Sequence, residues 1–514
     1  MAELDSPVVP TFNRVFELSA WALVTVLLAG LVVHNSLVLT LIHLGVPLVF
    51  VKLVSAWKDL AIALLLTAGF IVHRSRLRSV CLLDLILLSF VVLNLMYVVT
   101  SPGSLAQRLY GLRQNCVFGA AFGIGRLLPL RHRDAERALV VFVLAVTAAA
   151  LVGVAEVFLL PTRAWLNLGL PNYTQSLGFH YGGPFGLPEN LFINVHGVLV
   201  RRVISVYLSP LAMSFSVVLV LPPVVFLVVR RRSPGAIFWG AALSLLFLCL
   251  ALTLTRAAIL VAILVLVTTV IILRAGRRVV FLSAVLAIAS LAFLFSPLSS
   301  SLTPRVDWEL NPVAYVRLLS GMRFVGSLPS SATHSEASAV AAGRSLATVA
   351  GSASPVPVPR QSGGAGSLLF SGSDDSLREH LGAVLTGLRT LRAHPFGIGI
   401  GQAGSIAPRF GLVGRPGENV YLQLGAELGW IGLILVLLAH GAVVSNLVRW
   451  RMLLASEGPV GMYWLMAMVG GIGIFALQAE SDILGDFPIV IPLWIAIGWL
   501  ITIGRQGSTV RLNP

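Results

Sequence analysis

Long apolar runs separated by short polar segments recur along the whole chain. Each run has about 18 or more residues, which is enough for a helix to cross a hydrocarbon core of about 30 Å. The runs that predict membrane-spanning helices are residues 15–33, 56–73, 80–99, 112–129, 138–160, 204–229, 236–254, 257–273, 279–296, 420–445, 460–478 and 487–504. The pattern therefore predicts an all-α, polytopic membrane protein of about twelve spans.

The composition agrees with this pattern. The chain has 514 residues, of which 57% are hydrophobic and 11% are charged, and its mean hydropathy is +0.91. Soluble domains are closer to a quarter charged, so this much apolar surface requires a lipid solvent. Residues 1–14 are polar, and no small-residue cleavage site follows the first run, so we expect that run to remain as an anchor. The cysteines Cys81, Cys116 and Cys249 lie in or beside apolar runs, which predicts neither a disulfide framework nor a thiolate metal site.

The net charge of +15 is explained by topology better than by nucleic-acid binding. Arginines gather in short clusters between runs, at Arg74, Arg76, Arg78, Arg131, Arg133, Arg137, Arg230, Arg231, Arg232, Arg274, Arg277, Arg278, Arg449, Arg451 and Arg505. Such clusters mark cytoplasmic loops. They all fall on one side if the doubtful apolar segment 34–51 does not span. We therefore interpret residues 34–51 as interfacial or re-entrant, with both termini cytoplasmic.

This orientation divides the chain into three parts. Residues 1–296 hold nine spans and an outer segment at 161–203, residues 297–419 form a long outer loop, and residues 420–514 hold the last three spans.

The long outer loop changes character along its length. Residues 326–376 are rich in Ser, Gly, Ala and Pro and are expected to be flexible, because they cannot build a core. Leucines at helical spacing predict an amphipathic helix at 376–392 that lies over the outer face. Pro395 ends this helix, and the glycines of 397–404 predict a tight turn.

Arginines at the outer ends of spans are the first candidates for chemistry. Arg256 stands between two nearly continuous apolar runs, and Arg202, with Arg201 beside it, precedes another. Each could simply extend to lipid headgroups. The alternative is a clamp for a phosphate or diphosphate, because guanidinium groups bind such oxygens in bidentate fashion. Arg378 and His380 lie on the predicted amphipathic helix, where a solvated polar face is the simpler explanation.

Polar residues also gather where the span at 420–445 begins. Glu418 and Asn419 precede it and could act only as helix caps, whereas Glu427 lies about two turns inside, where a carboxylate indicates function. Tyr421 and Gln423 lie between them. The sequence has no Walker loop, HExxH, GxSxG or metal-spaced Cys/His cluster, so neither a metal nor a cofactor is expected.

Three blocks make the sequence resemble the O-antigen ligase and polymerase family of bacterial integral membrane glycosyltransferases. They are Arg202-Val-Ile-Ser-Val-Tyr-Leu-Ser-Pro-Leu-Ala212, Leu252-Thr-Leu-Thr-Arg256-Ala-Ala, and the set Ser376-Leu-Arg-Glu-His-Leu381, His394-Pro-Phe-Gly-Ile-Gly-Ile-Gly401 and Glu418-Asn-Val-Tyr-Leu-Gln-Leu-Gly-Ala-Glu427-Leu-Gly-Trp-Ile-Gly432. The resemblance covers about the C-terminal three fifths of the chain. Many members of that family have histidine where this chain has Glu418.

The resemblance implies a GT-C-like fold in the bacterial cytoplasmic membrane. It also implies metal-independent transfer from an undecaprenyl-diphosphate-linked glycan to a hydroxyl of another glycan or lipid-linked acceptor, as a polymerase or a ligase. Arg202 and Arg256, with Arg378, would neutralise the diphosphate, and Glu418 or His380 would be the base. Asn419, Tyr421, Gln423 and Glu427 would support the site, and polysaccharide assembly proteins are potential partners.

Two other classes of function remain open. A transporter or flippase of lipid-linked saccharides would explain the spans and the cationic sites, although transporters usually place substrate sites near the midplane between repeats. A scaffold of an envelope assembly machine would predict no loss of function from single arginine changes.

Overall fold

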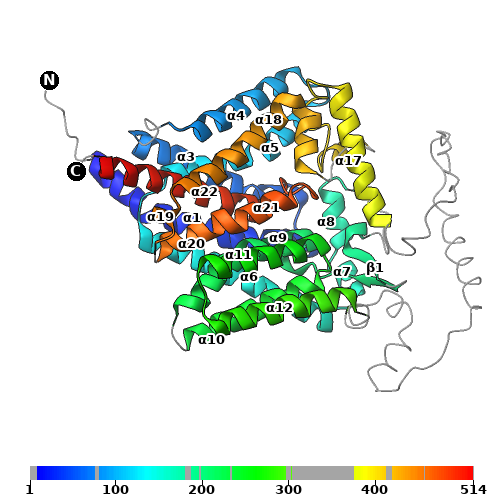
Figure 1. Ribbon diagram of the computed structural model, residues 1–514. Helices are drawn as coiled ribbons and strands as arrows, with labels where there is room; N and C mark the ends of the chain where they lie inside the picture. The colour runs from blue at the N-terminus through cyan, green and yellow to red at the C-terminus, as the bar shows by residue number, and fades with distance from the viewer. Residues whose placement is uncertain are drawn as a thin grey trace, which may run out of the picture.

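The computed structural model is a bundle of helices with one small hairpin of strands (Figure 1). It describes residues 8–75, 80–179, 187–195, 198–231, 234–296, 303, 375–412, 419–456 and 458–512. The elements of the first half are α1 (Val8–His43), α2 (Leu48–Ser55), α3 (Trp57–His73), α4 (Leu82–Thr100), α5 (Leu105–Leu127), α6 (His132–Leu159), α7 (Thr162–Asn167), α8 (Leu170–Ser176), β1 (Phe192–Val195) and β2 (Val198–Arg201). The elements of the second half are α9 (Pro210–Arg230), α10 (Gly235–Leu252), α11 (Arg256–Ile272), α12 (Arg277–Phe295), α17 (Asp375–Ala393), α18 (Val420–Arg449), α19 (Arg451–Leu454), α20 (Pro459–Leu465), α21 (Gly471–Leu477) and α22 (Phe487–Leu512).

The all-α polytopic prediction is confirmed, and each of the twelve predicted runs coincides with helix. Within the described residues, eight helical segments are long and apolar enough to cross a membrane: α1, α4, α6, α9, α10, α18, α22 and the unit Pro459–Leu477. That unit joins α20 to α21 through a π-helical turn at Met466–Gly470. The apolar helix α11 has 17 residues, and α5 carries Arg108, Arg113 and Arg126 within its length.

Residues 34–51 do not form a separate span, but the interpretation of the whole segment as interfacial or re-entrant is wrong, because residues 34–43 belong to the candidate span Ser19–His43. Helix α1 continues unbroken to His43 and ends before Gly45, whose φ of 73° is left-handed. The next helix, α2, has 8 residues, which rise only about 12 Å at 1.5 Å per residue. The chain therefore returns along α3 after a single crossing by α1.

The ends of α9, α11 and α18, where described members of the arginine clusters stand, lie at one end of the bundle, together with the start of α1 and the end of α22 (Figure 1). Arg131 donates to the Glu17 carbonyl at 3.1 Å, and Arg505 donates to the Val80 carbonyl at 3.1 Å. Arg231 pairs with Glu136 at 3.5 Å. We call this the arginine-rich end. Helix α17 and the β1–β2 hairpin lie at the opposite end, which we call the α17 end (Figure 1).

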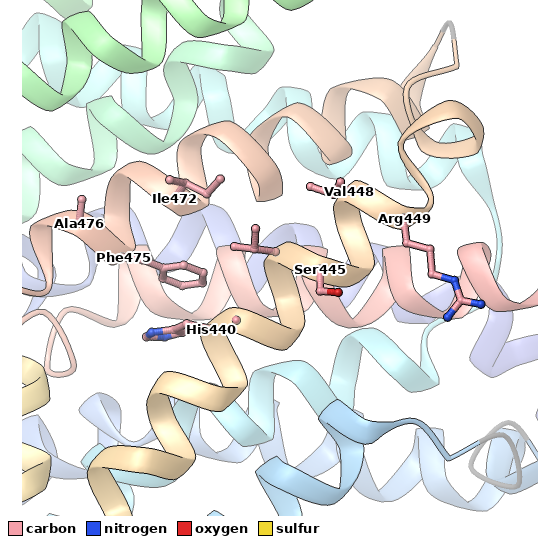
Figure 2. A pocket seen from close by; sticks show the side chains of 9 residues that line it. His440, Ser445, Val448, Arg449, Ile472, Phe475 and Ala476 are labelled. Atoms are coloured by element: carbon pink, nitrogen blue, oxygen red, sulfur yellow. The ribbon is translucent and has the colours of Figure 1, made fainter.

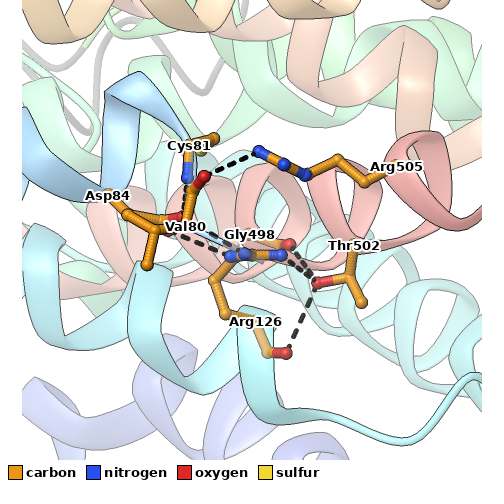
Figure 3. Close-up of polar contacts among 7 residues, drawn as sticks. All are labelled: Val80, Cys81, Asp84, Arg126, Gly498, Thr502 and Arg505. Carbon is orange, nitrogen blue, oxygen red and sulfur yellow. Dashed lines mark hydrogen bonds and ion pairs between the residues drawn. The ribbon is translucent and has the colours of Figure 1, made fainter. Parts of the chain in front are cut away.

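A buried ion pair fixes three helices near the arginine-rich end (Figure 3). Arg126 of α5 is 2% exposed and binds both carboxylate oxygens of Asp84 on α4, at 3.0 and 3.1 Å. Its Nη1 also donates to Thr502 Oγ1 of α22 at 2.9 Å. Helices α5 and α22 approach backbone to backbone, since a Cβ on Gly125 would lie 2.1 Å from the Ile495 carbonyl oxygen.

The core lies along α9 and α22, whose apolar windows are each 89% buried. A helix that is apolar on all sides belongs inside a bundle, and both sequences have this character. Helix α4 is only 28% buried and presents Leu88, Val92 and Leu95 outward, as a lipid-facing helix does.

Candidate functional site

Arg202 joins two of the sequence blocks at the α17 end. It follows β2, which pairs antiparallel with β1. Its Nε donates to the Thr253 carbonyl at 2.8 Å, and its Nη2 donates to Thr255 Oγ1 at 2.6 Å. Because Thr255 is the residue before α11, the first residue of that helix, Arg256, follows directly. The Arg202 side chain is therefore bonded to the turn that leads directly into Arg256, although the two arginines precede different spans.

The two arginines differ in what they offer to a ligand. Arg202 is half-buried, and its Nη1 also donates to the Asn190 carbonyl at 3.0 Å, so protein groups take three of the five N–H donors of a guanidinium. Burial lowers the pKa of Arg202 to about 10, opposed by the attraction of Glu480, so Arg202 is charged at neutral pH. Arg256 is exposed at the start of α11. Arg202 therefore holds the turn before α11, and Arg256 is the more exposed of the two arginines.

Arg201 has a structural role, unlike its neighbour. It is 2% exposed and binds Glu156 of α6 at 3.3 Å and the Leu160 carbonyl at 2.6 Å. The other Glu156 oxygen accepts from the backbone N–H groups of Ile204 and Ser205, at 3.3 and 2.8 Å. This carboxylate holds a strained loop, because Ser205 has a φ of 52°.

Helix α18 coincides with the predicted span at 420–445 but is broken at Gly429. Residues 19 positions apart in a straight helix are about 28 Å apart, yet the Tyr421 hydroxyl lies 3.1 Å from His440 Nδ1. Gly429 has φ 71° and ψ −168°, a conformation that only glycine adopts readily. The chain bends sharply there, into a short arm at 420–428 and a long arm at 430–449.

The predicted glycine turn packs against this break. Ile398 N–H donates to the Ala426 carbonyl at 2.7 Å, Gly399 N–H to the Glu427 carbonyl at 3.1 Å, and Trp430 N–H to the Pro395 carbonyl at 3.0 Å. A Cβ on Gly397 would lie 2.3 Å from the Glu427 carbonyl oxygen, so a side chain has no room there. Residues 395–399 thus donate to two carbonyls and accept from one N–H group that the break leaves without helical partners.

Glu427 is fully buried, and its carboxylate is held on both oxygens. Oε2 accepts from Asn115 Nδ2 at 2.9 Å, and Oε1 accepts from the backbone N–H of Ala403 at 3.1 Å. Asn115 also donates to Asn94 Oδ1 at 3.1 Å. Through these hydrogen bonds, Glu427 links α5 and the glycine turn to the short arm of α18.

An acidic loop between α21 and α22 is a feature that the sequence patterns did not predict. It carries Glu480, Asp482 and Asp486 within residues 478–486. Asp482 accepts from the Ser405 backbone N–H at 3.1 Å and, with the Gln423 amide turned so that its nitrogen faces the carboxylate, from Gln423 at 3.1 Å. The signal was present, because three carboxylates precede the last span in a chain that has only 21 acidic residues.

Burial and repulsion between like charges both affect the pKa values of the carboxyl groups in the acidic loop. Burial raises the pKa of Asp482, although its hydrogen bonds oppose that rise. Burial and the nearby charge of Asp482 raise the pKa of Asp486 to about 7. A carboxyl group with a pKa near neutrality can accept or release a proton at physiological pH.

The predicted supporting residues separate into two groups. Asn419 caps α18 by accepting the Leu422 N–H at 3.0 Å, and its Nδ2 donates to the Ala479 carbonyl at 2.5 Å, next to Glu480. Asn419 and Gln423 therefore contact the acidic loop. Tyr421 instead contacts His440 and the Phe475 carbonyl.

The predicted amphipathic helix is confirmed as α17, which lies across the end of the bundle opposite the arginine-rich end (Figure 1). It packs on the short arm of α18 through Gly387, beside Leu422, and through the buried Leu391. The side chains of Arg378 and His380, as well as Glu418 and the segment 326–374, lie outside the described residues.

Arg113 and Lys58 form a second group of cationic side chains. Both lie by the ring of Phe487, the first residue after the acidic loop. Arg113 binds both carboxylate oxygens of Asp59, at 2.8 and 3.0 Å, and its guanidinium lies 4.6 Å from the centre of the Phe487 ring. Lys58 Nζ lies 5.8 Å from the same ring and 2.5 Å from His34 Nε2. Arg113 and Lys58 thus lie beside the residue that follows the acidic loop.

In the part of the chain that the structure describes, no group of three or more His, Cys, Asp or Glu side chains could hold a metal ion. The chain matches no protein-family model, and no curated protein matches it by sequence.

Proposed function

We propose that this protein is a membrane glycosyltransferase of the O-antigen ligase and polymerase type. It would transfer a glycan from an undecaprenyl-diphosphate-linked donor to a glycan or lipid-linked acceptor. The observation that carries the proposal is the hydrogen bond of Arg202 to Thr255, because it ties the Arg202 side chain to the residue that precedes Arg256, while Glu480 of the acidic loop acts electrostatically on Arg202. Two cationic groups beside a proton acceptor are what transfer from a diphosphate requires.

The proposed reaction assigns each group one task. The acceptor hydroxyl oxygen forms a bond to the anomeric carbon of the donor sugar, and the bond from that carbon to the diphosphate oxygen breaks. Arg256, supported by Arg202, stabilises the charge that develops on the departing diphosphate. A base takes the hydroxyl proton, and the lipid diphosphate leaves with the bonding electron pair.

The base is one of three side chains. Glu418 and His380 are candidates from the sequence alone, and Asp486 joins them because its pKa of about 7 suits proton transfer at neutral pH. Replacing each in turn (Glu418→Gln, His380→Ala and Asp486→Asn) identifies the base as the variant that loses turnover while donor binding persists. A base usually contributes about 100-fold or more to the rate, so the three variants separate clearly.

The proposal places the α17 end on the extracytoplasmic face of a bacterial cytoplasmic membrane. Both termini would be cytoplasmic, because the arginine-rich end carries the positive charge that cytoplasmic loops favour. Labelling a cysteine introduced at Arg277 or at Ser405, in a variant whose Cys81, Cys116 and Cys249 are replaced by alanine, with a membrane-impermeant maleimide tests this orientation. We expect the residue 405 site to react from outside and the residue 277 site to react only after the membrane is opened.

One observation favours the alternative of a flippase for lipid-linked saccharides. Helix α18 is interrupted at Gly429 beside the buried Glu427, and interrupted spans often surround transport sites. Purified protein in liposomes distinguishes the two functions when it is given an undecaprenyl-diphosphate oligosaccharide and an acceptor. A transferase releases free undecaprenyl diphosphate and forms a longer glycan, whereas a flippase moves the intact donor and leaves it uncleaved.

A further inference from the structure

A groove of roughly 800 Å³ opens between the long arm of α18 and α21 (Figure 2). Its walls are mainly apolar and include Val444 and Val448 on one side and Ile472 and Phe475 on the other. Gly441 lies in the wall, and a Cβ at that position would meet no atom within 4 Å, so the groove is open there. The groove is separate from the arginines and the acidic loop of the proposed transferase site.

One end of the groove is lined by the stacked rings of His440 and Phe475. His440 stacks on Phe475 with 3.9 Å between ring centres. The Tyr421 hydroxyl donates its proton to the Phe475 carbonyl at 2.9 Å, so at the 3.1 Å contact it accepts from His440 Nδ1. His440 Nδ1 is therefore already paired within the protein, and this end presents mainly aromatic and apolar surface to a ligand.

The other end of the groove is cationic. Arg449, the last residue of α18, lines it and is exposed (Figure 2). Among the described residues, no carboxylate forms an ion pair with Arg449. From His440 to Arg449 the helix advances nine residues, or about 14 Å, which is a length that suits a hydrocarbon chain within one leaflet.

We propose that this groove binds an anionic phospholipid of the leaflet at the arginine-rich end. One acyl chain would lie between α18 and α21 and end against His440 and Phe475, and its phosphate would contact Arg449. The charge complementarity decides the occupant, because basic sites between spanning helices bind the headgroups of anionic lipids. This proposal is independent of the transferase proposal and concerns the opposite half of the bundle.

Separate variants test the proposed contact with the acyl chain and the proposed contact with the headgroup. Gly441→Trp fills the groove from a position with open space, and its matched control is Gly382→Trp, because a Cβ on Gly382 of α17 would also meet no atom within 4 Å. Arg449→Gln removes the headgroup contact. Its control is Arg451→Gln, because Arg451 is absent from the groove lining and contacts the Val448 carbonyl at 3.4 Å.

The measurement is the number of lipids bound to the purified full-length protein, titrated in detergent with phosphatidylglycerol or phosphatidylcholine of identical chains and counted by native mass spectrometry. We expect wild type to bind phosphatidylglycerol about fivefold more tightly, the preference that one arginine contributes. Arg449→Gln should abolish this preference, and Gly441→Trp should weaken both lipids, whereas both controls should match wild type. Equal binding of the two lipids by wild type, or wild-type binding by Gly441→Trp, would overturn the proposal.

Discussion

Removal of the Glu156 carboxylate should strongly destabilise the protein, because it leaves the buried Arg201 without its counter-ion. Both side chains are almost fully buried, with exposed fractions of 2% for Arg201 and 1% for Glu156. Breaking such a pair from one side costs about 3–5 kcal/mol, and Glu156→Leu also removes the acceptor of the Ile204 and Ser205 N–H groups. We expect a loss of at least about 3 kcal/mol in the free energy of unfolding.

The assay is unfolding by increasing mole fraction of SDS in mixed micelles, followed by circular dichroism. The double variant Glu156→Leu with Arg201→Met should recover much of the loss, because it buries no charge. The control is Asp134, a partly exposed carboxylate that pairs with Arg131 and Arg137, and Asp134→Asn should cost less than about 1 kcal/mol. The reasoning is refuted if Glu156→Leu costs no more than Asp134→Asn, or if the double variant loses the sum of the two single losses.

Three further predictions concern other parts of the molecule. The pKa of Asp486 is raised to about 7 in the fold from about 4 in the unfolded chain, so the folded state keeps a proton that the unfolded state has lost. Stability should therefore fall as pH rises from about 4 to 7, and Asp486→Asn should flatten that dependence in SDS unfolding at each pH. Gly429→Ala should lower the free energy of unfolding by about 2 kcal/mol or more, because its Cβ would lie 2.3 Å from the Pro395 carbonyl oxygen. Gly441→Ala, at a position with open space, should be neutral or stabilising. Equal effects of the two variants would contradict this prediction. Arg126→Met should lower the unfolding midpoint by leaving Asp84 unpaired, and Asp84→Asn combined with it should restore part of the loss.

Much of the architecture follows from hydropathy alone. The runs placed the helices, and the side shared by the arginine clusters predicted that residues 34–51 would not form a separate span. The structure brings described members of those clusters to one end through contacts such as Arg131 with the Glu17 carbonyl. The pairing of Arg202 with the turn before Arg256 was also within reach of the sequence, because both arginines precede apolar runs at the same face.

The break in α18 was not predictable from the same signals. Hydropathy averages over a run, and Gly429 is a small residue in an apolar stretch, so its left-handed φ leaves no trace in the pattern. The partners of buried charges were also hidden, since Glu427 binds Asn115, which is 312 residues away. Long-range pairs of this kind depend on helix packing, and a single sequence does not reveal them.

The most direct test of the proposed transferase compares two arginines that each begin a helix. Arg256 begins α11 at the α17 end, and Arg277 begins α12 at the arginine-rich end; both are exposed. The measurement is the rate at which purified protein releases undecaprenyl diphosphate from a defined oligosaccharide donor in the presence of acceptor. We predict that Arg256→Ala lowers this rate about 100-fold or more and that Arg277→Ala leaves it unchanged. Release at the wild-type rate by Arg256→Ala would contradict the proposed site.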